Sequence, residues 1–463
     1  MEKLQPERVF YYFSKLMEIP RPSFHEKKVS DFLVKTGKEL NLETYQDESL
    51  NVILKRKASK GYENAPKVIL QGHMDMVASK TEDSNHDFLK DSIIPVIDGK
   101  YLTAKDTTLG ADNGIAVAMG LALLEDENYV GPQIELLVTT EEETSMAGAL
   151  NLARDVLEGE YLINIDSEEE GVLTVGSAGG ITIFVEEKIG QEEQKDGYEI
   201  KVSGLLGGHS GMDINDNRGN ALKVFASILD NLNSDITIGE FTGGSLDNII
   251  PSSGSVKVYG AKLEEAKKNT LDKFKDVKGE LKIEINEASG KSYSKELSEK
   301  IIKMIANVAC GTNTMMKDGE TVESSDNLAL IKEEDGFIKS EISLRSSDND
   351  ALEELSKKIR KVIEDLGINY RIDSIYPGWE YKEDSKLRPL AQKVYKEFEG
   401  KEFDTIVIHA GLECGAFYEK YPNLDIISIG PNITGAHSPE EKVEIESVQR
   451  VYAYLKQLLK EIK

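Results

Sequence analysis

Side chains that can bind a divalent metal ion are scattered along most of the chain, and none of them is a cysteine. They are His73, Asp75, Asp112, Glu141, Glu142, Glu143, Asp166 and His437. Imidazole nitrogens and carboxylate oxygens suit borderline or hard divalent ions such as zinc, cobalt or manganese, and they are common ligands in hydrolytic sites. The residue types therefore predict a metalloenzyme.

The spacing of these residues suggests a role for each. His73 and Asp75 are two apart, so at a strand end they project to the same side, where a carboxylate can orient a metal-binding imidazole. We expect Asp75 to orient His73 rather than to bind the metal. Of the adjacent Glu142 and Glu143, one can bind a metal while the other acts as general base on the metal-activated water.

Asp112 has two carboxylate oxygens and could bridge two ions about 3.5 to 4 Å apart, the spacing of two-metal hydrolases. The predicted ligands then form three groups: His73 and Asp166 on one ion, Glu143 and His437 on the other, and Asp112 shared.

Each of these residues also has a purely structural interpretation. Asp75 and Asp112 could terminate a turn and cap a helix, as Asp commonly does. The acidic run 141–143 could be a solvated helix start, and His437 could be an exposed loop residue. The joint arrangement, rather than any single residue, favours the metal site.

Three short apolar runs, at 68–70, 134–138 and 161–165, predict strands that are buried on both faces. Each run is followed by a candidate ligand. In open α/β sheets, ligands bind in the crevice outside the carboxyl ends of the strands, so we expect the three strands to bring their polar residues together. Asp112 precedes the apolar run 115–124, which predicts a buried helix with Asp112 near its N-terminus.

The length of 463 residues favours two domains over one. Helical patterns open the chain at 10–17 and 29–33, and strand and helix patterns return at 404–409, 424–430 and 448–462. Between them, from about residue 185, charged amphipathic segments follow, with strand-like runs at 337–344 and 368–376 and a helical stripe at 352–366. We predict a discontinuous catalytic domain of residues 1–184 and 377–463, and an inserted domain of residues 185–376 with its helices on one face of a sheet.

Composition limits the possible partners and the location. Fifty-six basic and 83 acidic residues give a net charge of −27, which disfavours binding to nucleic acid or anionic membranes. The two cysteines, Cys310 and Cys414, cannot form a disulfide framework for a chain of this length. The N-terminus lacks the apolar core of a signal peptide, and the longest apolar stretch, 113–124, is shorter than the about 20 residues that span a bilayer. We therefore expect a cytoplasmic protein.

Seven motifs, in this order, resemble the aminoacyl-histidine dipeptidases of the zinc aminoacylase and carboxypeptidase metallopeptidase family. They are Gly-His-Met-Asp, Leu-Gly-Ala-Asp-Asn-Gly, Glu-Glu-Thr-Ser-Met-Ala-Gly-Ala, Asn-Ile-Asp-Ser-Glu-Glu-Glu-Gly, Gly-Gly-His-Ser-Gly, His-Ala-Gly-Leu-Glu-Cys-Gly and Gly-Ala-His-Ser-Pro-Glu-Glu. Any one of these motifs alone would be a weak signal. Together they make the resemblance specific, and it runs from about residue 73 to residue 444.

The resemblance implies an α/β fold, with a mixed-sheet catalytic domain for two zinc ions and an inserted α+β lid domain through which the chain could dimerise. It assigns the metals to His73, Asp112, Glu143, Asp166 and His437. It makes Asp75 the residue that orients His73, and Glu142 the general base, with Glu141 as an extra acid. In the inserted domain it assigns His209 to oxyanion stabilisation, and Asn248 and Arg345 to binding of the substrate or its carboxylate.

Three positions depart from the family pattern. Ser145 replaces a usual glycine, Asn215 a common histidine, and Asp247 a frequent basic residue. Because Asn215 and Asp247 lie in substrate-facing motifs, they bear on substrate preference rather than on the metal chemistry.

The resemblance implies a dipeptidase, of Xaa-His type or of broad specificity. An N-acyl amino acid deacylase or a broader exopeptidase on the same scaffold is the alternative among metal hydrolases. A serine hydrolase with Ser210 as nucleophile is disfavoured because the motif around it lacks the glycine-flanked serine elbow. The retained ligands and general base argue against a binding protein without catalytic activity.

Overall fold

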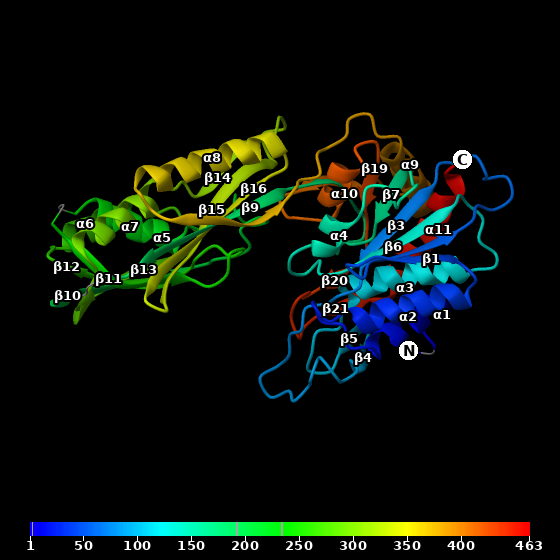
Figure 1. Ribbon diagram of the computed structural model, residues 1–463, viewed down its shortest axis with the longest axis horizontal. Helices are drawn as coiled ribbons and strands as arrows, with labels where there is room; N and C mark the ends of the chain where they lie inside the picture. Colours follow the sequence, from blue (N-terminus) through cyan, green and yellow to red (C-terminus); the bar gives the residue numbers. More distant parts are fainter. Residues whose placement is uncertain (2, 191–192, 233–234) are drawn as a thin grey trace. The chain divides into compact units, whose positions relative to one another are not determined.

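The structure, a computed structural model, describes residues 1, 3–190, 193–232 and 235–463. These residues form two compact units (Figure 1). Unit 1 contains residues 1–176, 379–407 and 412–463, so both ends of the chain belong to it. Unit 2 contains residues 177–378 and the short segment 408–411. The predicted boundaries lie at 184/185 and 376/377, and the compact units divide the chain at 176/177 and 378/379.

Unit 1 is built on a mixed eight-stranded sheet, which confirms the predicted α/β class. The strand order is β1 (Glu43–Gln46), β2 (Val52–Arg56), β6 (Ile134–Thr139), β3 (Val68–His73), β7 (Tyr161–Asn164), β19 (Asp425–Ser428), β8 (Val172–Ser177) and β18 (Asp404–Ile408). The central strands β6, β3, β7 and β19 run parallel to their neighbours within this group. Strands β3 and β6 are buried at every position, as expected for strands covered on both faces.

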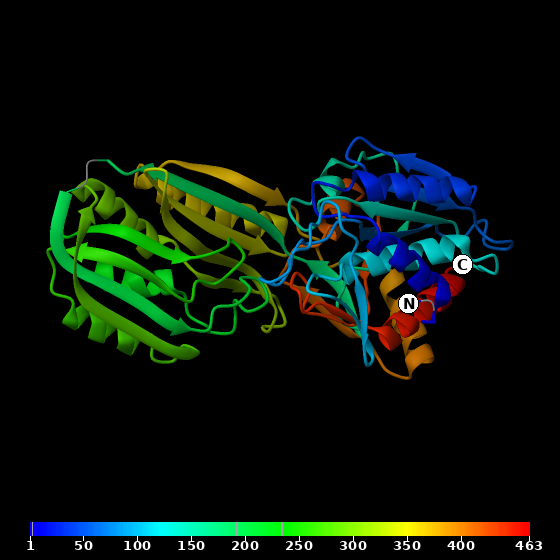
Figure 2. The same cartoon turned by 90° about the horizontal axis from the view of Figure 1, so that it is seen from below.

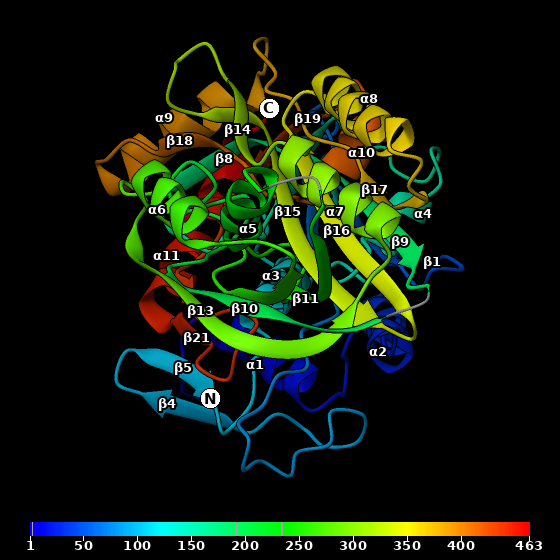
Figure 3. The ribbon, with the colours of Figure 1, turned by 90° about the vertical axis from the view of Figure 1, so that its left-hand side faces the viewer.

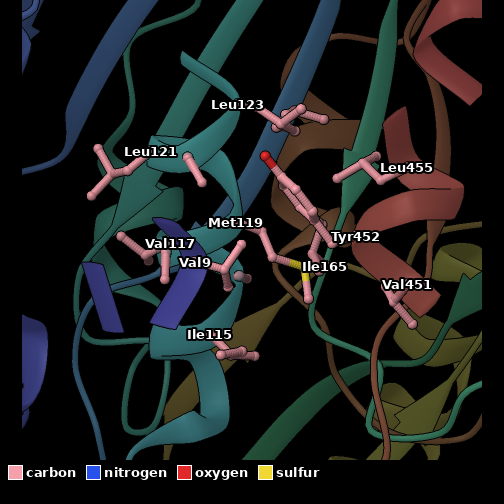
Figure 4. Packing of buried hydrophobic residues seen from close by; sticks show 14 of the residues in the cluster. Val9, Ile115, Val117, Met119, Leu121, Leu123, Ile165, Val451, Tyr452 and Leu455 are labelled. Atoms are coloured by element: carbon pink, nitrogen blue, oxygen red, sulfur yellow. The ribbon is translucent and has the colours of Figure 1, made fainter. Parts of the chain in front are cut away.

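The predicted apolar helix is α3 (Ala111–Glu125), and every residue from Ala111 to Leu124 is buried. It packs beside α1 (Glu7–Met17) and α11 (Ile445–Glu461), which come from opposite ends of the chain (Figure 2). Figure 4 shows Met119 and Leu123 of α3 among side chains of α1 and α11, together with Ile165, which directly follows β7. The other helices of unit 1 are α2 (Lys27–Glu39), α4 (Ala147–Asn151), α9 (Leu387–Glu399) and α10 (Cys414–Lys420). A helix that is apolar all round must be covered on all sides, and the two terminal helices help to cover α3.

A second, four-stranded sheet in unit 1 holds the loop that carries His437. Its order is β20 (Ile433–Thr434), β21 (Lys442–Glu444), β5 (Tyr101–Ala104) and β4 (Pro95–Asp98). Strands β20 and β21 pair antiparallel, and the 435–441 loop joins them. This sheet is not evident from the apolar patterns of the sequence, because its strands are short and β4 is exposed throughout.

Unit 2 contains a nine-stranded sheet with helices along one face (Figure 3). Eight strands follow the order β13 (Gly279–Ser292), β10 (Glu193–Leu205), β12 (Gly254–Tyr259), β11 (Thr237–Gly244), β15 (Val322–Glu334), β16 (Phe337–Ser346), β9 (Gly179–Lys188) and β17 (Tyr370–Tyr376), and β14 (Gly311–Met315) pairs with β15. The helices are α5 (Ala221–Asp230), α6 (Glu264–Lys273), α7 (Lys295–Asn307) and α8 (Asn349–Asp365). Their buried residues pack into a core of unit 2, and α8 buries the apolar stripe that the sequence predicts.

Among the residues that the structure describes, no helix has both the length and the apolar character that crossing a membrane requires.

Candidate metal centre

Three neighbouring strands end at the site, and each has a predicted metal-site residue at its last position or shortly after it. His73 is the last residue of β3 and pairs in register with Thr139, the last residue of β6. Asp166 follows β7, whose Asn164 pairs with Gln71. Because these strands are parallel, their carboxyl ends lie at one edge of the sheet. The register of the three strands therefore brings their polar residues together, as the sequence predicts.

Asp112 lies between two histidines that are far apart in the chain. Its Oδ1 is 3.1 Å from His73 Nε2, and its Oδ2 is 3.3 Å from His437 Nε2. The residue interrupts the helical geometry at the start of α3, with φ −79° and ψ 106°. This break directs each oxygen of one carboxylate toward a different imidazole, which is the arrangement that a bridging ligand needs.

The two acids Glu142 and Glu143 enter different clusters. His73, Asp112 and Glu143 form one group of potential ligand atoms that lie within 4.8 Å of one another, and His73, Glu142 and Asp166 form another. Glu143 Oε2 also lies 2.9 Å from His437 Nε2. His73, Asp112, Glu143, Asp166 and His437 are thus all brought together at the site.

Glu141 has a different environment. Its carboxylate accepts a hydrogen bond from Ser145 Oγ at 2.9 Å, and its backbone adopts a positive φ of 56°. It belongs to neither ligand cluster among the described residues. Ser145, one of the three positions that depart from the family pattern, therefore donates its hydrogen bond to Glu141, the one of the three consecutive glutamates that lies in neither cluster.

Asp75 is fully buried and has four polar neighbours. It lies 3.4 Å from His73 Nδ1, and it accepts hydrogen bonds from Ser23 Oγ and from the backbone N–H groups of Glu142 and Glu143. Burial by itself would raise the pKa of Asp75, but its contacts with His73 and the hydrogen bonds that it accepts hold that pKa below its ordinary value. An ionised Asp75 would keep the proton of His73 on Nδ1 and leave Nε2 as the metal-binding atom.

The site carries an excess of acids whose pKa values are raised. Burial and the charge of Asp112 raise the pKa of Glu143 to about 7, and burial, with Asp112 again contributing, raises the pKa of Asp166 to about 6. The pKa of His437 is raised to about 11 by Asp112 and Glu143. The buried Oδ1 of Asp166 also accepts no hydrogen bond within the described chain. Bound cations would stabilise the ionised form of these crowded carboxylates and would give the Asp166 oxygen a ligand bond, so the residues fit divalent metal ions.

The sequence-based prediction assigns no role to three buried residues near the site: Arg21, Glu413 and Glu441. Glu413 accepts hydrogen bonds from Gln71 and Thr139, on β3 and β6, both at 2.6 Å. Burial raises the pKa of Glu413 to about 8. Arg21 and Glu441 contact the backbone around Asp75 and Asp112. Glu413 and Glu441 lie within two of the seven motifs, which is a signal that could have singled them out, whereas Arg21 lies outside all seven.

The residues predicted to bind substrate lie in unit 2, and two of them share a paired segment. His209 forms an isolated bridge with Ile249, and the Ser210 N–H donates to the carbonyl of Asn248 at 2.8 Å. His209 Nδ1 accepts the backbone N–H groups of Gly211 and Met212. In a neutral ring the proton is then on Nε2.

Arg345 lies in a row of residues that crosses four strands. It pairs with Ser325 on β15 and with Gly180 on β9, and Gly180 pairs with Tyr376 on β17. Directly paired residues of antiparallel strands share one face. A Cβ on Gly180 would collide with the ring of Tyr376, so the glycine lets that ring cross the strand, and Arg345 donates to its hydroxyl at 2.8 Å.

His409 is buried beside this row, in the short segment of unit 2. Its Nε2 lies 2.7 Å from Ser325 Oγ. Burial, together with the charges of Arg345 and His209, lowers the pKa of His409 to about 4. A neutral imidazole therefore lies next to the Arg345 guanidinium at neutral pH.

Neither Ser210 nor Cys414 has the surroundings that a catalytic nucleophile needs. Ser210 Oγ is buried and has no hydrogen-bond partner in the described chain, so no base activates it. Cys414 is fully buried, and burial raises its pKa well above the ordinary thiol value. A thiol in such surroundings stays protonated and inert.

Comparison with known proteins gives a relationship over the whole chain. The chain is 34% identical to the cytosol non-specific dipeptidase of Escherichia coli strain K12 over 481 aligned positions, which cover 100% of this chain and 99% of that protein. The crystal structure of the aminoacylhistidine dipeptidase of Vibrio alginolyticus is similar with a TM-score of 0.87 and 34% identity, and it covers 100% of this chain and 98% of that one.

The aminopeptidase PepT of Bacillus cereus shares the fold at 15% identity, with a TM-score of 0.59 over 99% of each chain. The family model for peptidase family M20/M25/M40 matches residues 69–461, from β3 to the last residue of α11. This match includes every residue of the candidate metal centre. The chain belongs to peptidase family M20/M25/M40.

Proposed function

We propose that this protein is a dipeptidase that depends on two divalent metal ions, with zinc as the preferred ion. The observation that carries the proposal is Asp112, whose two oxygens each face a different histidine at 3.1 and 3.3 Å. His73 and Asp166 would hold one ion, Glu143 and His437 the other, and Asp112 both. The 34% identity to two dipeptidases over nearly their full lengths supports the substrate class.

Bound ions would acidify water and polarise the scissile carbonyl. Glu142 is the proposed general base: it would accept the proton of the attacking water and deliver it to the leaving amine. Its carboxylate lies 3.9 Å from His73 Nε2. Burial and neighbouring acids raise its pKa well above the ordinary value, and positive charge bound among those acids would lower the pKa again, so that Glu142 could act as a base.

The groups proposed to bind the substrate are His209, Asn248 and Arg345. Arg345 supports this assignment because its guanidinium is held by Tyr376 while its Nε remains without a partner in the described chain. A buried guanidinium of this kind suits a carboxylate, which it can bind through two hydrogen bonds. We propose that the carboxylate is the C-terminus of the dipeptide and that His209 stabilises the oxyanion.

The decisive experiment measures hydrolysis and metal content on one sample. We expect free dipeptides, including those with C-terminal histidine, to be cleaved, and N-acylated amino acids and N-blocked dipeptides to be poor substrates. Treatment with a chelator should abolish activity, and zinc, cobalt or manganese should restore it. Preferential cleavage of N-acyl amino acids would instead identify a deacylase, and activity that survives complete metal removal would exclude the proposal.

Two further proposals concern the protein in the cell. A cytoplasmic location is supported by the E. coli relative, which is named a cytosol dipeptidase. Dimerisation through residues 185–376 is a proposal from the family resemblance alone, and light scattering on the purified protein would test it.

A further inference from the structure

Helix α3 begins without a capping side chain of its own. Its N-cap is Gly110, with a positive φ of 71°, and no side chain of the cap accepts a hydrogen bond. The first N–H groups of a helix need acceptors from elsewhere when they are buried. Asp112 is the second residue of this helix, so whatever satisfies these groups also fixes the backbone of Asp112.

Glu441 supplies the missing acceptors from far along the chain. Its Oε2 accepts the N–H groups of Leu109 and Gly110 at 2.7 and 2.9 Å. Its Oε1 accepts those of Ala111 and Asp112 at 2.7 and 3.2 Å. The side chain is only 2% exposed. One carboxylate thus satisfies four consecutive N–H groups of the turn that leads into α3 and carries Asp112.

Arg21 holds the same turn from the other side. Its guanidinium donates to the carbonyl of Gly110 and to the carbonyls of Met74 and Asp75. Gly110 therefore donates its N–H to Glu441 and accepts a hydrogen bond from Arg21 at its carbonyl. Because Met74 and Asp75 directly follow His73, Arg21 ties the backbone next to His73 to the backbone next to Asp112.

Glu441 also belongs to the loop that carries His437, since both lie between β20 and β21. The three segments that present His73, Asp112 and His437 are therefore joined through two buried, oppositely charged side chains, neither of which lies in a ligand cluster of the described chain. This connection would set where the two oxygens of Asp112 lie relative to the two imidazoles.

We propose that Arg21 and Glu441 are positioning residues for Asp112 and that they determine how tightly the protein binds both metal ions. This inference rests on the proposed two-metal function. Residues that orient metal ligands from outside the coordination sphere typically change metal affinity about 10- to 100-fold when they are replaced. Glu441→Gln keeps the size of the side chain but presents an amide NH₂ to two of the four N–H donors.

Asp425 offers a matched control in the eight-stranded sheet, at the opposite ends of the strands from the metal-site residues. It is buried at the start of β19, and its carboxylate accepts the N–H groups of Lys386 and Leu387 at the beginning of α9. Asp425→Asn removes a distant helix cap of the same kind and lies remote from the strand ends that carry the metal-site residues. The Asp425→Asn variant therefore measures how much stability is lost when a buried carboxylate that caps a helix is replaced, while the metal centre is unchanged.

The experiment titrates Zn²⁺ and Co²⁺ into metal-free wild type, Glu441→Gln, Arg21→Lys and Asp425→Asn by calorimetry, and records the Co²⁺ visible spectrum and the melting temperature of each metal-free protein. We expect about 10- to 100-fold weaker binding and an altered Co²⁺ spectrum in Glu441→Gln and Arg21→Lys. Asp425→Asn should melt earlier but bind metal like the wild type.

The outcomes separate this inference from the function on which it rests. If the wild type binds fewer than two ions, the two-metal function itself fails. If the wild type binds two ions and both site variants match its affinity and spectrum, only the positioning roles fail. If Glu441→Gln does not fold, the metal affinity and Co²⁺ spectrum of the folded Arg21→Lys variant test the inference. If neither variant folds, the two residues have a structural role and the inference is overturned.

Discussion

Asp75 accepts the backbone N–H of Glu142 at 3.1 Å. The same carboxylate lies 3.4 Å from His73 Nδ1, so a proposed metal ligand and the proposed general base are oriented by one buried side chain. The two residues come from the ends of neighbouring strands, β3 and β6. We therefore expect a change at Asp75 to affect both the proposed metal binding by His73 and the proposed proton transfer by Glu142.

Replacement of Asp75 by Asn should impair both steps. The amide can accept fewer hydrogen bonds than the carboxylate, and it removes the negative charge next to His73. We expect about 10- to 100-fold weaker metal binding. We also expect a fall in kcat that persists when metal is saturating, because the backbone N–H of Glu142 loses a carboxylate acceptor. Calorimetric metal titration combined with kcat at saturating zinc separates the two effects. Complete recovery of kcat at high zinc would limit Asp75 to the orientation of His73.

The three consecutive glutamates should respond differently to conversion into glutamine. Glu142→Gln should retain two metal ions and lose about 100-fold or more in kcat, because a positioned general base typically contributes 10²- to 10⁴-fold. Glu143→Gln should lose metal, since its carboxylate faces His437 at 2.9 Å. Glu141→Gln should behave like the wild type because its carboxylate contacts Ser145. Metal content and kcat measured on all three variants test these roles, and an inactive, metal-loaded Glu141→Gln would move the general base by one position.

Metal affinity should fall as the pH decreases from about 8 to 5. The raised pKa values of Glu143, about 7, and Asp166, about 6, mean that both acids gain protons over this range, and protons compete with metal for the same oxygens. His437, with its pKa raised to about 11, is protonated throughout, so metal binding should release a proton even at pH 8. Calorimetry in buffers of different ionisation enthalpy counts these protons. If the number of protons released on metal binding does not rise as the pH falls, Glu143 and Asp166 are not the acids that compete with the metal for protons.

The sequence allows much of unit 1 to be predicted because buried parallel strands have a strong pattern. The runs before His73, Glu142 and Asp166 are confirmed as β3, β6 and β7, and the apolar run after Asp112 is confirmed as α3. Each ligand candidate follows its element by only a few residues, so local sequence is sufficient to place it. The roles of these residues in metal binding and catalysis stay predictions until they are measured.

Arg21, Glu413 and Glu441 could not be found in the same way. Their partners are backbone groups or uncharged side chains that the fold brings close. Arg21 lies between two prolines and outside the seven motifs, and Glu413 and Glu441 lie within motifs that do not reveal which groups they contact. Contacts of this kind depend on the completed tertiary structure, and no periodicity or motif spacing encodes them.

Arg345 and Tyr376 make the proposed carboxylate recognition testable within unit 2. Tyr376→Phe removes the hydroxyl that accepts the Arg345 hydrogen bond at 2.8 Å and frees the guanidinium to move. Hydrogen bonds to charged groups contribute about 1.5 to 3 kcal/mol, so we expect KM for a dipeptide to rise about 10-fold or more, with a smaller change in kcat. Arg345→Met should have a larger effect in the same direction. The control substrate is the same dipeptide with a C-terminal amide, whose KM should change little in either variant because it lacks the carboxylate. Equal increases in KM for the acid and the amide would show that Arg345 does not recognise the C-terminus.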